Sequence, residues 1–547
     1  MKTVKSTSLK LFLAFTISIA CDLIAVNSFC QVGRTPTNAN VNKNISNNNA
    51  IKVYQNEIEN IPAPTQFIVI GKADFSAICQ NFITHKNQIG ITTRFIDLES
   101  ILQHFVGDEP SRVKQAIAYA FINKGLRYVM LVGDASLFPV RHRFISSGNE
   151  FGRPKNSTDD WWYDGAYVAT DHYYACLFHH NFSSRTAYSM KEYDDWDGNK
   201  NNKYAEEVWN WDNDPKLTPV TYNPDNVDGL PDLVVSRLPI HDGTDLKVYL
   251  DKVLKYDNGQ MLPQTKQGLC MVAGGTYPGS AQLCEDILSF HSIKDHVGDD
   301  NLLKFGFNFN NGLPSGWDNG SFASIRNGII HTWSLIYLGH GYQGGWDISD
   351  SKRGFNENEI NIYTGKLSLP VVFNIGCEIG QFKPVVPRGP YLDNYNRLTW
   401  YYQFDHNVIW KGSGDNLNPN MNDPLKNLPT TIAAPGPYDL ADQKDRTFAY
   451  PWLFQKDEAG AIAFFAETLV CENYHGKDLV ERVLNAYYNG TSRNTTLLGD
   501  IWLSGQRQYW EEFKTSVDVF HNPRIYLTIM TFFGDPTLKL PPPNNKS

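Results

Sequence analysis

The sequence lacks the short signatures of several enzyme classes. It contains no HExxH, the paired histidines of many zinc peptidases, and no GxSxG, the turn that carries the serine of many hydrolases. It has no basic run, and its formal charge of -9 disfavours binding to phosphate backbones and anionic lipid. We therefore expect no nucleic-acid partner. Glycosidases have no short signature, so these absences do not exclude that class.

Cysteine is also scarce, with eight residues in a chain of 547. There is no CxxC, so a zinc ribbon is not indicated, and the irregular spacing does not indicate a disulfide scaffold. There is room for one or two bridges at most, so a cysteine in an unusual context is easily noticed. Six cysteines follow the first 30 residues: Cys79, Cys176, Cys270, Cys284, Cys377 and Cys471.

Long apolar runs are absent except near the start of the chain. Lys2, Lys5 and Lys10 precede an apolar run over residues 11–20, which is typical of an export signal and too short to span a bilayer. We favour simple cleavage after Cys30 over the lipoprotein alternative, in which Cys21 would be lipidated. No later stretch has 18 uninterrupted apolar residues, so we expect a secreted, extracellular or periplasmic protein without a membrane span.

Two series of strands and helices follow a lead-in rich in Asn, Thr and Ser. Apolar strands alternate with helices in both series, which predicts mainly parallel sheets covered by helices, in an α/β fold of two tandem subdomains. The first series has strands at 67–70, 92–98, 128–132 and 233–239, with helices over 73–86, 111–123 and 243–256. The second has strands at 268–273, 303–307, 329–338, 370–376, 461–465 and 525–531, with helices over 281–296 and within 477–514.

The expected organisation has five parts. They are a signal peptide (1–30), a flexible lead-in (31–62), an N-terminal α/β subdomain with acidic loops (63–262), a C-terminal catalytic α/β subdomain (263–540) containing a turn-rich insertion (383–448), and a tail (541–547). The insertion is rich in Tyr and Trp. An aromatic lid over the site and ordinary packing of a surface excursion explain this composition equally well.

Two reactive side chains stand at the carboxyl ends of predicted strands. One strand runs into Gly339-His340-Gly341 and another into Cys377. Ligands bind at this edge of open α/β sheets, so His340 and Cys377 are expected to face each other. An imidazole within reach of a thiol produces a thiolate–imidazolium pair, the nucleophile of acyl transfer. The N–H groups of Gly341 and Cys377 could then form an oxyanion hole. A lone cysteine after an apolar strand is ordinarily a core residue, but the matching histidine favours catalysis.

These segments resemble those of the gingipain-like peptidases, which belong to the caspase-like clan. The likeness covers the histidine segment with Trp346, the cysteine segment around Cys377 and Glu378, and the stretches YVMLVGD, DGLPDLVVSRLP, GAIAFFAET and FGDPTLKL, over about residues 65 to 540. The resemblance implies a caspase-like fold, cysteine endopeptidase activity through a Cys/His dyad, a protein or peptide substrate and no organic cofactor. It also implies substrate-binding positions at Trp346 and Glu378.

The sequence departs from this family in one part of the site. Gingipains place a glutamate that orients the histidine shortly after the first strand of the second subdomain, where this chain has Gly275. The family's acidic residue in the basic-specific pocket falls near Glu285 or Asp286, and the alignment does not choose between them. The missing glutamate leaves an inactive surface-binding module open as an alternative. A sortase-like transpeptidase is a second alternative, because an amine can release the same acyl-enzyme in place of water.

An acidic segment in the first subdomain has the pattern of a calcium loop. Oxygen-bearing side chains alternate along it and a glutamate follows at the twelfth place, as in loops that wrap Ca²⁺. The glycine is misplaced for an EF-hand, and a solvated polar turn is the simpler alternative. Because the resembling family binds structural calcium, we predict a calcium site. Its expected ligands are Asp195, Asp197, Asn199, Asn201 and Glu206.

Overall fold

The structure is a computed structural model, and it places most of the two predicted subdomains. The predicted signal peptide, most of the lead-in, nearly all of the insertion and Asn201 lie outside the described residues. The described residues are 57–146, 166–181, 189–200, 204–208, 223–262, 268–277, 279–310, 312–342, 344–350, 353–361, 368–382, 391–392, 398–399, 447–455, 459–469, 472–490, 497–516 and 522–542.

The N-terminal half forms four parallel strands in the order β2-β1-β3-β9. Their bounds are β1 Phe67–Gly71, β2 Thr93–Asp97, β3 Tyr128–Val132 and β9 Val234–Leu238. Every residue of β1, β3 and β9 is buried, as their continuous apolar sequences predict for strands covered on both faces. The main helices are α4 Ser76–Gln88, α5 Leu98–His104, α6 Glu109–Lys124 and α8 Gly243–Asp257. Of these, α5 was not expected, and its start is capped by the Asp97 carboxylate, which accepts from two N–H groups.

The N-terminal half also contains shorter elements, of which α3 precedes β1 and the others follow β3. They include two small sheets, β5-β4-β8 and β6-β7. Their bounds are α3 Glu57–Asn60, β4 Arg141–Ser146, β5 Ala166–Thr170, α7 His172–Ala175, β6 Phe178–Asn181, β7 Ser189–Tyr193 and β8 Tyr204–Val208.

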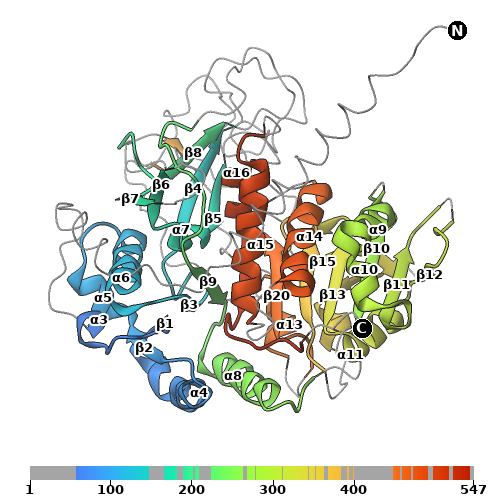
Figure 1. Cartoon of the computed structure of the whole chain (residues 1–547), viewed down its shortest axis with the longest axis horizontal. Coiled ribbons are helices and arrows are strands. Elements are labelled where there is room, and N and C mark those ends of the chain that lie inside the picture. Colours follow the sequence, from blue (N-terminus) through green and yellow to red (C-terminus); the bar gives the residue numbers. More distant parts are fainter. Residues whose placement is uncertain are drawn as a thin grey trace, which may run out of the picture.

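The C-terminal half forms six parallel strands in the order β12-β11-β10-β13-β17-β20. Their bounds are β10 Leu269–Gly274, β11 Leu302–Phe307, β12 Asp318–Asn319, β13 Ser334–Leu338, β17 Val371–Ile375 and β20 Ala463–Glu467. The longer helices are α9 Ser280–Ser289, α11 Phe322–His331, α14 Asn473–Asn489 and α15 Leu498–Phe513. Figure 1 shows α14 and α15 packed together with α9 beside α14.

Smaller elements complete this half. A three-stranded sheet, β14-β15-β16, begins immediately after His340. The short elements are α10 Ile293–Val297, β14 Gly341–Tyr342, β15 Gly345–Asp350, β16 Arg353–Asn356, α12 Glu357–Asn361, β18 Tyr391–Leu392, β19 Leu398–Thr399 and α13 Ala449–Leu453.

The strand β21 (Met530–Gly534) joins the two halves into one eleven-stranded sheet. It pairs antiparallel with β20 and parallel with β9, so the sheet runs from β2 at one end to β12 at the other (Figure 1). The predicted tandem α/β architecture is confirmed, but its two sets of strands share a single sheet. Because β9 and β20 run in opposite directions, the carboxyl ends of the two sets lie at opposite edges. A site at the ends of β13 and β17 therefore belongs to the C-terminal half.

Two predicted strands are partly helical. Residues 329–331 complete α11, whose start has a capping box between Ser321 and Ser324, so β13 begins only at Ser334. Residues 525–529 belong to α16 (Pro523–Ile529), because Pro523 sets the first helical turn and the Asn522 side chain accepts from the N–H of Arg524. The last strand therefore lies five residues later than expected. In the part of the chain that the structure describes, no helix is long and apolar enough to cross a membrane.

Candidate active site

Neighbouring strands deliver His340 and Cys377 to the same edge of the sheet. In the parallel pair of β13 and β17, Leu338 lies opposite Ile375, and each reactive residue follows two positions later. The Gly339 N–H donates to the carbonyl oxygen of Ile375 at 3.2 Å, which continues the pairing into the histidine turn. A Cβ atom added to Gly341 would lie 3.2 Å from the Cys377 carbonyl oxygen. The structure thus brings the two predicted turns into contact.

The turn after β17 presents Cys377 through an unusual backbone conformation. Glu378 has φ of 61°, in the left-handed region that non-glycine residues seldom adopt. Its N–H donates to the Leu469 carbonyl at 3.3 Å, and the Gly380 N–H donates to the Glu467 carbonyl at 2.8 Å. These bonds fasten the turn to the end of β20. The Glu378 side chain is only 8% exposed, so little of it is offered to a substrate.

Cys377 differs from the other described cysteines in its environment. Its side chain is partly exposed, whereas Cys79, Cys176, Cys270 and Cys284 are buried free thiols. Burial raises the pKa of Cys79 to about 12 and raises those of the other three buried thiols further above their usual range. Cys471 lies outside the described residues. Solvent access therefore separates Cys377 from the buried cysteines.

The histidine turn is fastened through its backbone while the His340 side chain stays exposed. The carbonyl oxygen of His340 accepts from the Tyr337 hydroxyl at 2.5 Å and from the Asp347 N–H at 2.9 Å. The Asn473 side-chain amide donates to the Gly339 carbonyl at 3.1 Å. The direction in which the imidazole leaves the sheet is therefore set by partners from β13, β15 and α14.

Gly341 occupies a position with no room for a side chain. An added Cβ would lie 2.3 Å from Cδ1 and 2.7 Å from Cγ1 of Ile379, which is fully buried. Glycine is thus required for the close approach of the two turns. An oxyanion hole formed by the N–H groups of Gly341 and Cys377 needs this close approach.

Trp346 is a supporting residue of the core, which corrects its expected direct contact with substrate. It is 0% exposed and stacks between Tyr337 at 4.4 Å and Phe355 at 4.9 Å, measured between ring centroids. Its indole N–H donates to the Asn374 side chain of β17 at 2.5 Å. The side chain therefore holds β15 against β13 and β17 below the site, and offers no surface to a ligand.

A comparison with protein families now identifies the chain. The model of peptidase family C25 matches residues 60–393 and 420–541, which is most of the sequence. The chain belongs to peptidase family C25. It is accordingly a cysteine-type peptidase, as predicted, and its substrates are proteins or peptides. A comparison with curated proteins found no match.

Comparison with solved structures finds chains of similar fold. The crystal structure of the Arg-specific cysteine proteinase gingipain R is 15% identical, with a TM-score of 0.50, and the match covers 87% of this chain and 78% of that one. A further protease structure is 12% identical, with a TM-score of 0.50 and coverages of 88% and 79%. The complex of the Porphyromonas gingivalis RgpB pro- and mature domains is 16% identical, with a TM-score of 0.49 and coverages of 87% and 79%. At these identities the likeness shows the fold alone.

In this C25 peptidase, the two candidate acids for a basic-specific pocket already have partners. Both lie on α9. The Glu285 carboxylate accepts from the Lys304 ammonium and from the Trp317 indole N–H, each at 2.8 Å, and Asp286 accepts from Gln282 at 2.9 Å. Lys304 is in register with Met271, three residues before the end of β10. The Glu285 side chain is thus directed along the sheet, away from the edge at which Cys377 lies. A role in substrate binding stays a prediction for both acids.

Sequence reasoning missed the residues that surround His340 from outside its own strand. The Tyr277 ring lies 5.3 Å from that of His340, centroid to centroid, at an interplanar angle of 70°. The Tyr277 hydroxyl donates to the Glu472 carboxylate at 2.6 Å. No short motif links residues 277 and 472, so only the fold reveals this cluster.

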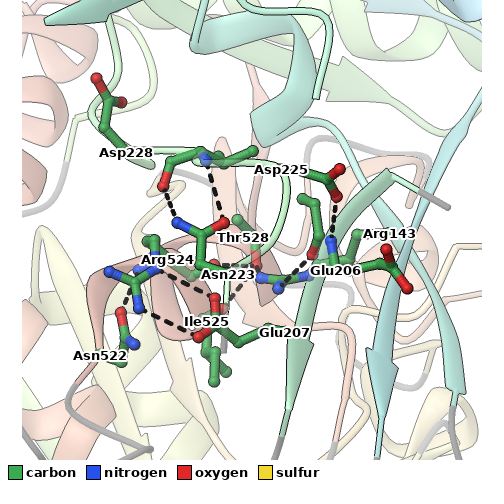
Figure 2. Close-up of polar contacts among 12 residues, drawn as sticks. Arg143, Glu206, Glu207, Asn223, Asp225, Asp228, Asn522, Arg524, Ile525 and Thr528 are labelled. Carbon is green, nitrogen blue, oxygen red and sulfur yellow. Dashed lines mark hydrogen bonds and ion pairs between the residues drawn. The ribbon is translucent and has the colours of Figure 1, made fainter. Parts of the chain in front are cut away.

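A residue that the calcium pattern did not include, Asp225, lies against the acidic loop of the C25 peptidase. Its carboxylate accepts from the Glu206 N–H at 2.7 Å, a bond visible in Figure 2, and from the Asn199 N–H at 3.4 Å. Burial and, to a lesser degree, the nearby carboxylates of Glu206 and Asp197 raise the pKa of Asp225 to about 7. The predicted loop thus gathers negative charge around a buried carboxylate.

The described part of this loop only partly fits a calcium ion. No three His, Cys, Asp or Glu side chains among the described residues are grouped as a metal centre requires, and Asn201 is not described. The Asp195 carboxylate accepts from the Asp197 N–H at 3.2 Å, and the Asn199 amide donates to Glu206 at 2.7 Å. A half-turn of that amide would present its oxygen, the atom that calcium binds.

Proposed function

We propose that this C25 peptidase is a secreted cysteine endopeptidase that hydrolyses peptide bonds through Cys377 and His340. The contact between their two turns, at the ends of adjacent parallel strands, is the observation that carries the proposal. The partly exposed thiol and the exposed imidazole, both on firmly bonded turns, fit a dyad that meets substrate at the sheet edge.

The dyad would work by acyl transfer. His340 takes the proton of the Cys377 thiol, and the thiolate attacks the carbonyl carbon of the scissile peptide bond. The resulting oxyanion is held by the N–H groups of Gly341 and Cys377. The imidazolium then gives its proton to the departing amine, which leaves a thioester on Cys377. Water, deprotonated by His340, hydrolyses that thioester and restores the free thiol.

Selective alkylation tests the proposed thiolate. At pH 6 to 7.5, iodoacetamide is expected to modify Cys377 at least about 10-fold faster than any described buried cysteine, because those thiols are inaccessible and have raised pKa values. Peptide mapping by mass spectrometry after short exposure measures the rates. The variant His340→Ala should slow the alkylation of Cys377 at the same pH. Equal, slow labelling of all cysteines would instead favour an inactive binding module.

Hydrolysis and transpeptidation share the same thioester and differ only in what releases it. Digestion of an unstructured protein with and without a competing amine separates them, because transfer would place the amine on the new carboxyl terminus. We expect hydrolysed ends to dominate in water. Amine-capped ends in large excess would assign the enzyme to the sortase-like alternative.

We also propose that calcium binds the acidic loop, with Asp225 added to Asp195, Asp197, Asn199, Asn201 and Glu206. The carboxylates of Glu206 and Asp197 near the buried Asp225 support this, since a divalent cation would neutralise their charges. Calcium is therefore expected to raise the melting temperature at pH 8, and a chelator to reverse the rise.

The variant Asp225→Asn is expected to change the melting temperature by an amount that depends on pH. A folded-state pKa of about 7, above the usual value of about 3.9, means that Asp225 costs stability progressively as pH rises from about 4 to about 7. In chelator, Asp225→Asn should thus raise the melting temperature more at pH 8 than at pH 5. It should also shrink the gain that calcium gives. An unchanged melting temperature on adding calcium to the unmodified protein would refute the site.

Export completes the proposed function. The Lys-rich start and the apolar run at 11–20 support a cleaved signal, with lipidation at Cys21 as the less favoured alternative. Both lie outside the described residues. Sequencing the amino terminus of protein recovered from the culture medium would find Gln31 first if cleavage follows Cys30.

A further inference from the structure

We propose that Tyr277, held by Glu472 and Asn473, is a positioning residue for His340 and replaces an acid at residue 275. The inference rests on the proposed Cys377–His340 chemistry. The sequence has Gly275 where the resemblance to gingipains places a glutamate that orients the histidine.

The backbone at Gly275 leaves no place for an acidic side chain. A Cβ there would lie 2.7 Å from the Phe307 carbonyl oxygen and 2.8 Å from the Asn308 carbonyl carbon and oxygen. These are backbone atoms of and after β11, and the Gly275 N–H itself donates to the Phe307 carbonyl at 2.6 Å. The close approach of the chain to β11 therefore excludes any residue but glycine, and support for His340 must come from elsewhere.

A turn after β10 brings Tyr277 to the histidine instead. The Tyr277 N–H donates to the Gly274 carbonyl at 3.1 Å, which folds the chain back. Gly274 in turn meets Gly339 so closely that a Cβ on Gly339 would lie 3.2 Å from the Gly274 Cα. The Tyr277 and His340 rings consequently meet in a T-shaped contact, which restricts rotation of the imidazole.

Two residues at the start of α14 hold Tyr277, whose hydroxyl donates one hydrogen bond and accepts another. Its hydroxyl donates to the Glu472 carboxylate at 2.6 Å and accepts from the Asn473 N–H at 3.3 Å. The Asn473 side chain also donates to the Gly339 carbonyl, so one residue holds both the tyrosine and the histidine turn.

This arrangement favours the charged form of the dyad. The Glu472 carboxylate places negative charge one ring away from His340, and a tyrosine that donates to a carboxylate has an electron-rich ring against the imidazole. Both effects stabilise the imidazolium that forms when His340 takes the Cys377 proton. The cluster thus supplies orientation and electrostatic support without touching substrate.

The test compares two tyrosines with similar contacts. Tyr450 also donates to a carboxylate, that of Asp245 at 2.8 Å, and its ring meets that of His241 at 5.1 Å. In the full-length protein, Tyr277→Phe is expected to lower kcat by about 10-fold with KM nearly unchanged, while Tyr450→Phe leaves kcat unchanged. Peptide cleavage and thermal unfolding are measured for both variants and the unmodified protein.

The pH dependence of kcat/KM distinguishes electrostatic support of His340 from a merely structural role of the cluster. Glu472→Gln keeps an acceptor for the tyrosine but removes the charge, so the alkaline limb of kcat/KM is expected to shift to lower pH. Alkylation of Cys377 by iodoacetamide near neutral pH should slow by a similar factor in Tyr277→Phe. If the unmodified enzyme is active but Tyr277→Phe and Glu472→Gln leave kcat, the pH profile and the alkylation rate unchanged, the role of Tyr277 is overturned and the dyad is not. An unmodified protein with no cleavage and no selective alkylation would overturn the dyad itself.

Discussion

Replacing Cys377 by alanine is expected to lower peptide cleavage by about 10⁴-fold or more, because the acyl-enzyme can no longer form. The residual rate would come from binding and from the oxyanion donors alone. Initial rates on a peptide library measure the loss, and the same library gives the preferred residue before the scissile bond. Substrate binding to the inactive variant should persist, since the Cys377 side chain contributes little contact area.

Three further variants complete that experiment. His340→Ala should lose about as much activity as Cys377→Ala, and the double variant no more than either, because the two groups act as one unit. Cys284→Ala provides the matched control, since it removes a free but fully buried thiol and should leave kcat intact. Cleavage that survives in Cys377→Ala would assign the chemistry to another part of the protein.

Gly341→Ala is expected to lower kcat/KM by about 10² to 10³, with the fold retained. The new methyl group would meet Ile379 at 2.3 Å and the Cys377 carbonyl oxygen at 3.2 Å, so the two turns must separate. A separation of this size disturbs both the dyad and the oxyanion donors. Peptide kinetics and a thermal melt distinguish this local loss from unfolding.

Relief of the same clash provides the control for Gly341→Ala. Ile379→Ala removes Cγ1 and Cδ1, the two atoms that the added methyl would approach most closely. The double variant should therefore regain part of the lost kcat/KM relative to Gly341→Ala, while Ile379→Ala alone mainly lowers stability. Equal activity of Gly341→Ala and the unmodified enzyme would show that close contact of the turns is not needed.

The parts of the fold that periodicity encodes could be predicted from the sequence. Continuously apolar strands, such as β13 and β17, are covered on both faces, so their sequences alone mark them as central parallel strands. The equivalent positions of His340 and Cys377 at two strand ends predicted the contact of their turns, because register transmits position across a sheet. Helix boundaries were less predictable, since the cap at Ser321 and the turn set by Pro523 converted apolar stretches into α11 and α16.

Other features of the site could not be predicted, because they depend on contacts between parts of the chain that are distant in sequence. Tyr277 and Glu472 meet only because α14 begins beside the end of β10. The resemblance places Trp346 at the substrate, but stacking with Tyr337 makes it part of the core. The pairing of Tyr277 with Glu472 and the stacking of Trp346 leave no local pattern, so neither feature could be seen in the sequence.

The position of β21 has a consequence for biosynthesis. This strand is made after every other strand of the sheet, yet it lies in the middle and pairs with both β9 and β20. The strands that it separates in space cannot join while the ribosome is still translating the segment before residue 530. A nascent chain therefore holds two unfinished half-sheets with open edges, and chaperones that shield such edges would act on it until β21 emerges.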